Sequence, residues 1–288
     1  ISFLFFFFFI FVIYIKGFNF GLDFKGGLQL EITSEFNNID LLKKDFKNLG
    51  IENFNLIKYG DEKNFLLTIF NCELKNKDVI INLICDYFNI NELEKKFKFR
   101  KLEYIGSIIS DKLYDQSSFA IFVALIFMFI YITFRFNYQF GLCAIIALFH
   151  DVVFLLGIIS IFNIEFTLVL FASLLSVIGY SINDTVVIFD RIRENINKLK
   201  DYNLYEIIND SINKTLSRTL MTSFTTLLVV ITLLVFGGVS LFNFSLILFL
   251  GIIIGTYSSI YIAPYCIFLF SKYTKVYIKS FDNFDNMP

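Results

Sequence analysis

Long, largely apolar segments dominate the chain and predict membrane-spanning helices. Such segments lie within residues 114–135, 138–162, 165–189, 216–236 and 243–271, and each range exceeds the ~20 residues that a span needs. The apolar run of residues 1–15 is shorter, and we interpret it as a first span truncated at its start. A secretory signal peptide is the rival, but no small-residue cleavage site follows Ile15. The pattern predicts a polytopic α-helical membrane protein with six transmembrane helices.

A polar block, residues 16–113, separates the first two predicted spans and alternates between strand-like and helix-like patterns. Apolar and polar residues alternate as in strands, or recur at helical spacing, in turn along the block. The predicted elements are, in order, a strand at Leu28–Ile32, a helix at Ile39–Leu49, strands at Phe54–Tyr59 and Phe65–Phe70, a helix at Lys77–Phe88 and a strand at Phe97–Ile105. This β-α-β-β-α-β order is the ferredoxin-like pattern. We therefore expect a small α+β ferredoxin-like external domain between helices one and two.

Basic residues in the short polar segments predict the orientation of the spans. Lys and Arg occur in residues 190–215 and in the tail, residues 272–288, whereas the short segments near residues 163–165 and 237–243 contain none. Because positive loops stay in the cytoplasm, both termini are expected there and the block 16–113 outside. Apolar residues at helical spacing within residues 190–215 also predict an amphipathic helix on the membrane surface.

Composition excludes several classes of function. Of the 288 residues, 56% are hydrophobic, which excludes a purely cytosolic enzyme. A net charge of −1 leaves no excess of positive charge for nucleic acid. Four scattered cysteines and one histidine predict neither a metal site nor a cofactor, and no nucleophile triad or phosphate loop indicates catalysis. Cys72 and Cys85 lie in the polar block, where pairing and free thiols both stay open.

Asp184 and Arg218 lie inside predicted spans, where a charge costs about 2.5 to 3.5 kcal/mol at the centre. Counted from the polar segment between their spans, the two residues lie at equal depth, which permits a pair; a later helix start would instead place Arg218 at the interface. Thr222 and Thr225 share the helix face of Arg218 and either line a proton pathway or bond to their own backbone. Asp184 is predicted to couple protonation to conformational change, with a static ion pair as the alternative.

Two further features of the spans concern helix contacts. His150 and Asp151 lie near the middle of the third span and form either a proton relay or a helix contact. Gly251 and Gly255 form a small-residue stripe in the last span and predict close helix packing. Pro264 in the same span predicts a kink.

Two motifs stand out in the chain: GLDFKGG at residues 21–27, with Gly21, Asp23, Gly26 and Gly27 as a structural joint, and GYSINDTVVIFDRIREN at residues 179–195. They resemble the SecF family of the bacterial SecDF protein-export complex, within the resistance-nodulation-division superfamily. HD at residues 150–151 and SRTL at residues 217–220 match as well. The resemblance implies a subunit of the bacterial inner membrane with residues 16–113 in the periplasm.

The resemblance also implies function and partners. Its expected partners are SecD, the SecYEG translocon, exported preproteins and membrane lipid, and its expected work is protein export driven by the proton-motive force. Asp184 and Arg218 are then the proton-pathway residues. The alternatives are one half of a resistance-nodulation-division exporter of small molecules or lipids, and a non-conducting scaffold.

Overall fold

The computed structural model describes residues 2–34, 39–51, 53–58, 64–70, 79–80, 82–84, 97–198 and 203–274. The protein consists of two compact units. The helical unit comprises residues 1–18, 120–164 and 169–288, and the sheet unit comprises residues 19–119 and 165–168.

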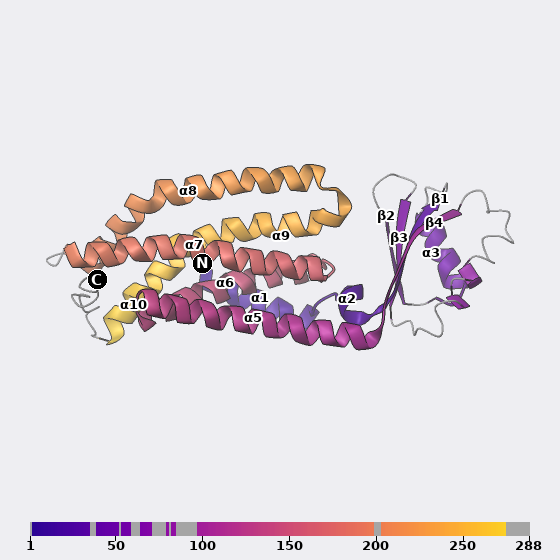
Figure 1. Ribbon diagram of the computed structural model, residues 1–288, viewed down its shortest axis with the longest axis horizontal. Coiled ribbons are helices and arrows are strands. Elements are labelled where there is room, and N and C mark those ends of the chain that lie inside the picture. Colours follow the sequence, from indigo (N-terminus) through magenta and orange to yellow (C-terminus); the bar gives the residue numbers. More distant parts are fainter. Residues whose placement is uncertain are drawn as a thin grey trace, which may run out of the picture. The chain divides into compact units, whose positions relative to one another are not determined.

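The described residues include five helices long and apolar enough to cross a membrane. Four are single helices, and the fifth is a continuous run in which a π-helical turn joins two α-helices. They are α5 (Ser107–Arg135), α6 (Tyr138–Ile161), α7 (Leu168–Lys198), α8 (Leu204–Phe236), and α9 (Gly238–Tyr257) followed by η1 (Ser258–Ile262) and α10 (Ala263–Thr274). A sixth apolar helix, α1 (Ser2–Lys16), has 15 residues. Within the helical unit, α1 packs along α6 and α8 along α9 (Figure 1).

The boundaries differ from the prediction between the third and fourth long helices. Instead of a separate surface helix within residues 190–215, α7 continues to Lys198, and α8 runs unbroken from Leu204 to Phe236. The segment joins α8 because its buried residues continue the buried face of the span. Ile208 and Ser211, near the start of α8, lie on the same buried face as Thr215 and Thr219. One helix therefore buries both the amphipathic segment and the apolar span.

An antiparallel sheet forms the centre of the sheet unit. Its strands are β1 (Gly27–Ser34), β2 (Phe54–Lys58), β3 (Asn64–Phe70) and β4 (Phe97–Ile105), in the order β2-β3-β1-β4. Alternate β1 residues Leu28, Leu30 and Ile32 join a buried core with Phe46 of α3 (Ile39–Asn48), as period-2 alternation requires. Most of the predicted helix Lys77–Phe88 lies outside the described residues, and so do Cys72 and Cys85.

Candidate functional site

Asp184 of α7 is buried among hydroxyl groups. Its carboxylate is 2% exposed, and the Ser223 hydroxyl of α8 lies 3.5 Å from Oδ2. Ser223 in turn lies 2.7 Å from the Thr256 hydroxyl of α9 and accepts a 3.3 Å hydrogen bond from Tyr180. A buried carboxylate needs polar partners. The hydroxyl network around Asp184 therefore joins α7, α8 and α9.

Arg218 does not pair directly with Asp184. No ion pair joins the two in the described part of the chain, and Arg218 is exposed on α8, although its charge still acts on the carboxylate. The helix phase explains this, because α8 turns Thr219 and Ser223 inward and Arg218 precedes Thr219 by one residue, which is about 100° around the helix. α8 begins at Leu204, so the later helix start considered for Arg218 does not occur, and Arg218 is exposed on a helix that continues on both sides of it.

The hydroxyl face of α8 differs from the face chosen from the sequence. Thr225 is exposed and donates to the carbonyl oxygens of its own helix, whereas half-buried Thr222 bonds its own backbone and also reaches Asp184. The buried hydroxyl residues are Ser211, Thr215, Thr219 and Ser223. Their spacing of four residues places them on one helix face. This spacing is visible in the sequence and could have identified the buried face of α8.

His150 and Asp151 form a second buried network in the helical unit. Asp151 is 1% exposed, and its Oδ2 accepts hydrogen bonds of 2.7 Å from both Ser181 of α7 and Ser258 of η1. Its Oδ1 lies 3.1 Å from His150 Nδ1, and His150 Nε2 lies 2.8 Å from the Ser2 hydroxyl of α1. The pair therefore connects α6 to three other helices.

Gly251 and Gly255 lie where α9 meets α7. A Cβ at Gly251 would lie 2.2 Å from Val177 Cγ2, and one at Gly255 would lie 3.0 Å from Ser181 Cβ. A side chain at Gly251 would therefore clash with Val177, and one at Gly255 would be tightly packed against Ser181; small residues permit such close helix contact. The stripe thereby brings α9 against the part of α7 that carries Asp184.

The glycine-rich motif forms a clasp in the sheet unit, which we define as residues 19–26 together with residues 165–168. Leu168, the first residue of α7, donates its backbone N–H to Asp23 Oδ2 at 2.7 Å. Gly21 donates to the Phe166 carbonyl at 2.9 Å, and Phe166 donates to the Asn19 carbonyl at 2.7 Å. A carboxylate that accepts from the first turn of a helix satisfies an otherwise unpaired donor. Asp23 therefore caps the helix that carries Asp184.

Charged and small residues of the clasp also lie close to one another. Burial raises the pKa of Glu165; the nearby Lys25 charge opposes that rise, and the Asp23 charge adds to it. A Cβ at Gly21 would lie 2.9 Å from Thr167 Cγ2, so the glycine allows the two segments to touch. The motif is thus a contact between distant segments as well as a turn.

Replacement of the cap is expected to loosen the first turn of α7. Asp23→Ala should lower the free energy of unfolding by about 1 kcal/mol, the usual loss for a helix cap, whereas Asp23→Asn keeps an acceptor oxygen and should stay close to the parent. Thermal unfolding of the purified chain in detergent measures both. Equal stability of Asp23→Ala and the parent would contradict the capping role.

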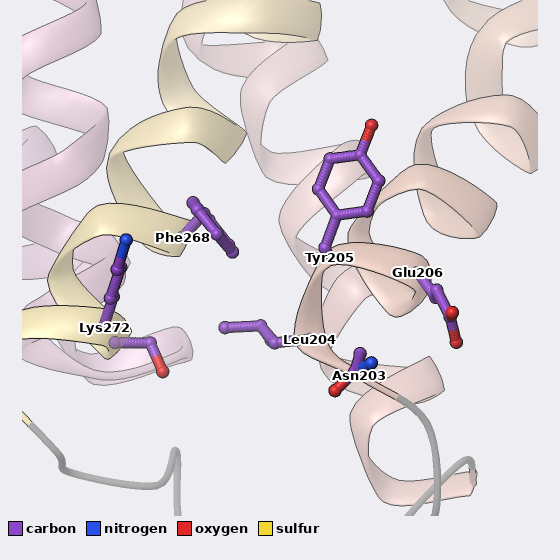
Figure 2. A pocket seen from close by; sticks show the side chains of 7 residues that line it. Asn203, Leu204, Tyr205, Glu206, Phe268 and Lys272 are labelled. Carbon is purple, nitrogen blue, oxygen red and sulfur yellow. The ribbon is translucent and has the colours of Figure 1, made fainter.

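A shallow groove at the end of the helical unit holds none of the predicted site residues. It measures about 330 Å³ and lies between the start of α8 and α10, with Asn203, Leu204, Tyr205, Glu206, Phe268, Ser271 and Lys272 as its lining. Figure 2 shows that Phe268 and Lys272 come from α10 and that the Glu206 side chain points away from Lys272. Among the described residues, no group of three or more His, Cys, Asp or Glu side chains is placed to hold a metal. The buried networks around Asp184 and Asp151 therefore remain the candidate site.

Both motifs and most of the chain match known proteins. Residues 88–273 match the family described as protein export membrane protein SecD/SecF, C-terminal, and residues 11–36 match the SecD/SecF GG motif. Protein translocase subunit SecF of Rickettsia conorii is 40% identical over 252 residues, which are 87% of this chain and 82% of that protein. The chain belongs to the SecF family.

Other SecF proteins and solved SecDF structures agree with this assignment. SecF of Pseudomonas aeruginosa is 40% identical over 253 residues, 87% of this chain and 81% of that protein. The crystal structure of SecDF from Thermus thermophilus, described as a translocon-associated membrane protein, matches with a TM-score of 0.83 and 34% identity over 94% of this chain. A SecDF structure in a super-membrane-facing form matches with a TM-score of 0.71 and 33% identity over 95% of this chain. This SecF-family chain spans 37% of each of those SecDF chains.

Proposed function

We propose that this SecF-family chain pairs with SecD and uses the proton-motive force to promote protein export across the inner membrane. The observation that carries the proposal is Asp184, a carboxylate buried between three membrane helices within the family's fourth-span motif. Intramembrane carboxylates are expensive and mark ion or proton pathways. Arg218, whose charge acts on Asp184, is the second proton-pathway residue in this proposal.

The proposed mechanism is a change of contacts around Asp184. As a carboxylate, Asp184 accepts hydrogen bonds from hydroxyls of α8 and attracts the Arg218 charge. Protonation removes that charge and weakens both interactions, so α8 is free to shift against α7. Loss of the proton on the other side of the membrane restores the first arrangement. Alternation between the two states couples proton flow to motion.

The proposed setting follows from SecF membership and the chain's pattern. The partners are SecD, the SecYEG translocon, exported preproteins and membrane lipid, with both termini in the cytoplasm and residues 16–113 in the periplasm. We also propose that α1 is a membrane span, because it is apolar and packs along α6, which is long enough to cross a membrane. The β-α-β-β-α-β order of a ferredoxin-like domain agrees with the antiparallel sheet.

Complementation tests the proposed function. Cells depleted of their own SecF are given this chain together with its own SecD, and export of a pulse-labelled secreted protein is followed with and without an uncoupler. The chain should restore export, and the uncoupler should remove the gain. If the chain co-purifies with SecD at normal levels and export stays at the depleted level, the proposal is wrong.

A further inference from the structure

The last long helix departs from α-helical geometry beside a buried carboxylate. η1 spans Ser258–Ile262 and is a π-helical turn between α9 and α10. Such turns are rare and occur mostly as single turns within α-helices, often at functional sites. Pro264 follows the turn and cannot donate a backbone hydrogen bond, so part of the local disturbance comes from the sequence. Side-chain contacts add to the backbone hydrogen bond that the Ala263 N–H donates to the Ser258 carbonyl.

Two consecutive serines of η1 make those contacts. The Ser258 hydroxyl donates to Asp151 Oδ2 at 2.7 Å, and the Ser259 hydroxyl lies 2.8 Å from Thr185 Oγ1 and 3.1 Å from the Ser181 carbonyl. Both serines are 0% exposed. Asp151 is therefore a hydrogen-bonded anchor for the π-helical turn, and Ser181 of α7 is bonded to the same carboxyl oxygen.

The anchored turn lies next to the Asp184 network in sequence and in space. Thr256, which is hydrogen-bonded to Ser223, precedes Ser258 by two residues. Ser181, which shares Asp151 with Ser258, precedes Asp184 by three residues, on an adjacent part of the α7 surface. Asp151 thus links the part of α7 just before Asp184 to the turn just after Thr256. Thr256 in turn bonds Ser223, the α8 residue whose hydroxyl lies beside Asp184.

We propose that Asp151 is a positioning residue that fixes the π-helical turn against α7 and so keeps the hydroxyl partners of Asp184 in place, without itself carrying the transported proton. The proposal extends the proposed function, because it presumes that Asp184 is the proton-linked group. It also assigns His150 a structural part. With Nδ1–H donating to Asp151, Nε2 accepts from the Ser2 hydroxyl, which ties α1 to the anchor.

Asparagine at position 151 separates positioning from proton carriage. Its carbonyl oxygen can accept from both Ser181 and Ser258, and its amide can donate to His150 Nδ1 once His150 adopts the other tautomer and donates from Nε2 to Ser2. Every hydrogen bond of the anchor is then retained, while the titratable proton is lost. Alanine at the same position removes all of these bonds.

Hydrogen–deuterium exchange of the complex with SecD tests the anchor directly. In Asp151→Ala, amides of residues 258–263 should exchange about tenfold faster, since loss of buried hydrogen bonds costs about 1 to 3 kcal/mol; Asp151→Asn should stay within about twofold of the parent. Ser176→Ala, which removes an exposed α7 hydroxyl that donates to the Ala172 carbonyl of the same helix, is the control. Unchanged exchange in Asp151→Ala would overturn the proposal. If that variant fails to assemble, Ser258→Ala removes the hydrogen bond from Ser258 to Asp151 and should still raise the exchange rate of amides 259–263.

Export assays supply the second readout. Asp151→Asn should retain most of the parent's proton-gradient-dependent export, and Asp151→Ala should lose about tenfold. An Asp151→Asn variant as inactive as Asp184→Asn, with unchanged exchange at residues 258–263, would make Asp151 a proton carrier and overturn the positioning role. The exchange experiment needs no export activity, so its result stands even if the proposed function fails.

Discussion

Asp184→Asn is expected to abolish proton-gradient-dependent export while assembly with SecD persists. Asparagine has nearly the same shape as aspartate and keeps a carbonyl oxygen for Ser223, which now lies 3.5 Å from the carboxylate. It cannot exchange a proton, and it carries no charge to attract Arg218. Export should fall at least about tenfold, toward the level of depleted cells, because no step can then couple to the gradient. Pulse-labelled export at matched expression measures the loss.

Asp190→Asn provides a matched control on the same helix. Asp190 pairs with Arg135 at 3.1 Å, and both side chains are about half exposed, so the pair contributes at most about 1 kcal/mol. This variant also removes one negative charge from α7, six residues after Asp184, and cells that carry it should show the same export as cells with the parent chain. Equal export by Asp184→Asn and the parent would show that the carboxylate is structural and would favour the scaffold alternative.

The long apolar helices and the strands were predictable because local pattern decides them. Runs such as residues 138–162 have no other favourable environment than a bilayer, and α6 begins at Tyr138 as predicted, with Asn137 accepting from its backbone N–H. The joining of the amphipathic segment to α8 was not predictable in the same way. It depends on packing against the helical core, which overrides a polar local composition.

The site was predictable in its residue types and less so in its contacts. Burial of Asp151 and Asp184 follows from the cost of charge within a span, but the partners come from helices far apart in the sequence. Asp23 and Leu168 are separated by 145 residues, and no local pattern connects them. The π-helical turn likewise depends on a contact with Asp151 across 107 residues. Pro264 marks only the neighbourhood of that turn.

Alanine at position 27 is expected to disrupt the sheet unit. Gly27 has φ +143°, and a Cβ there would lie 2.1 Å from the Ile69 carbonyl oxygen. That oxygen belongs to the backbone of β3, which pairs with β1, so the clash cannot be relieved by a side-chain rotation. Strain and overpacking together should lower the stability of the sheet unit by about 3 kcal/mol. Thermal unfolding and proteolysis of the purified complex measure the loss.

Gly106→Ala separates this effect from a general effect of alanine. The nearest neighbour of a Cβ there would be the Tyr104 ring at 3.7 Å, which is ordinary contact. Gly106 precedes α5 and accepts its first backbone hydrogen bonds, so this variant should lose no more than about 1 kcal/mol. Equal stability of Gly27→Ala and Gly106→Ala would contradict the proposed clash. Because Gly27 follows Asp23 by four residues, displacement of β1 should also pull Asp23 away from the Leu168 N–H. A Gly27→Ala protein whose α7 exchanges faster at its first turn would thus show that the sheet holds the clasp in place.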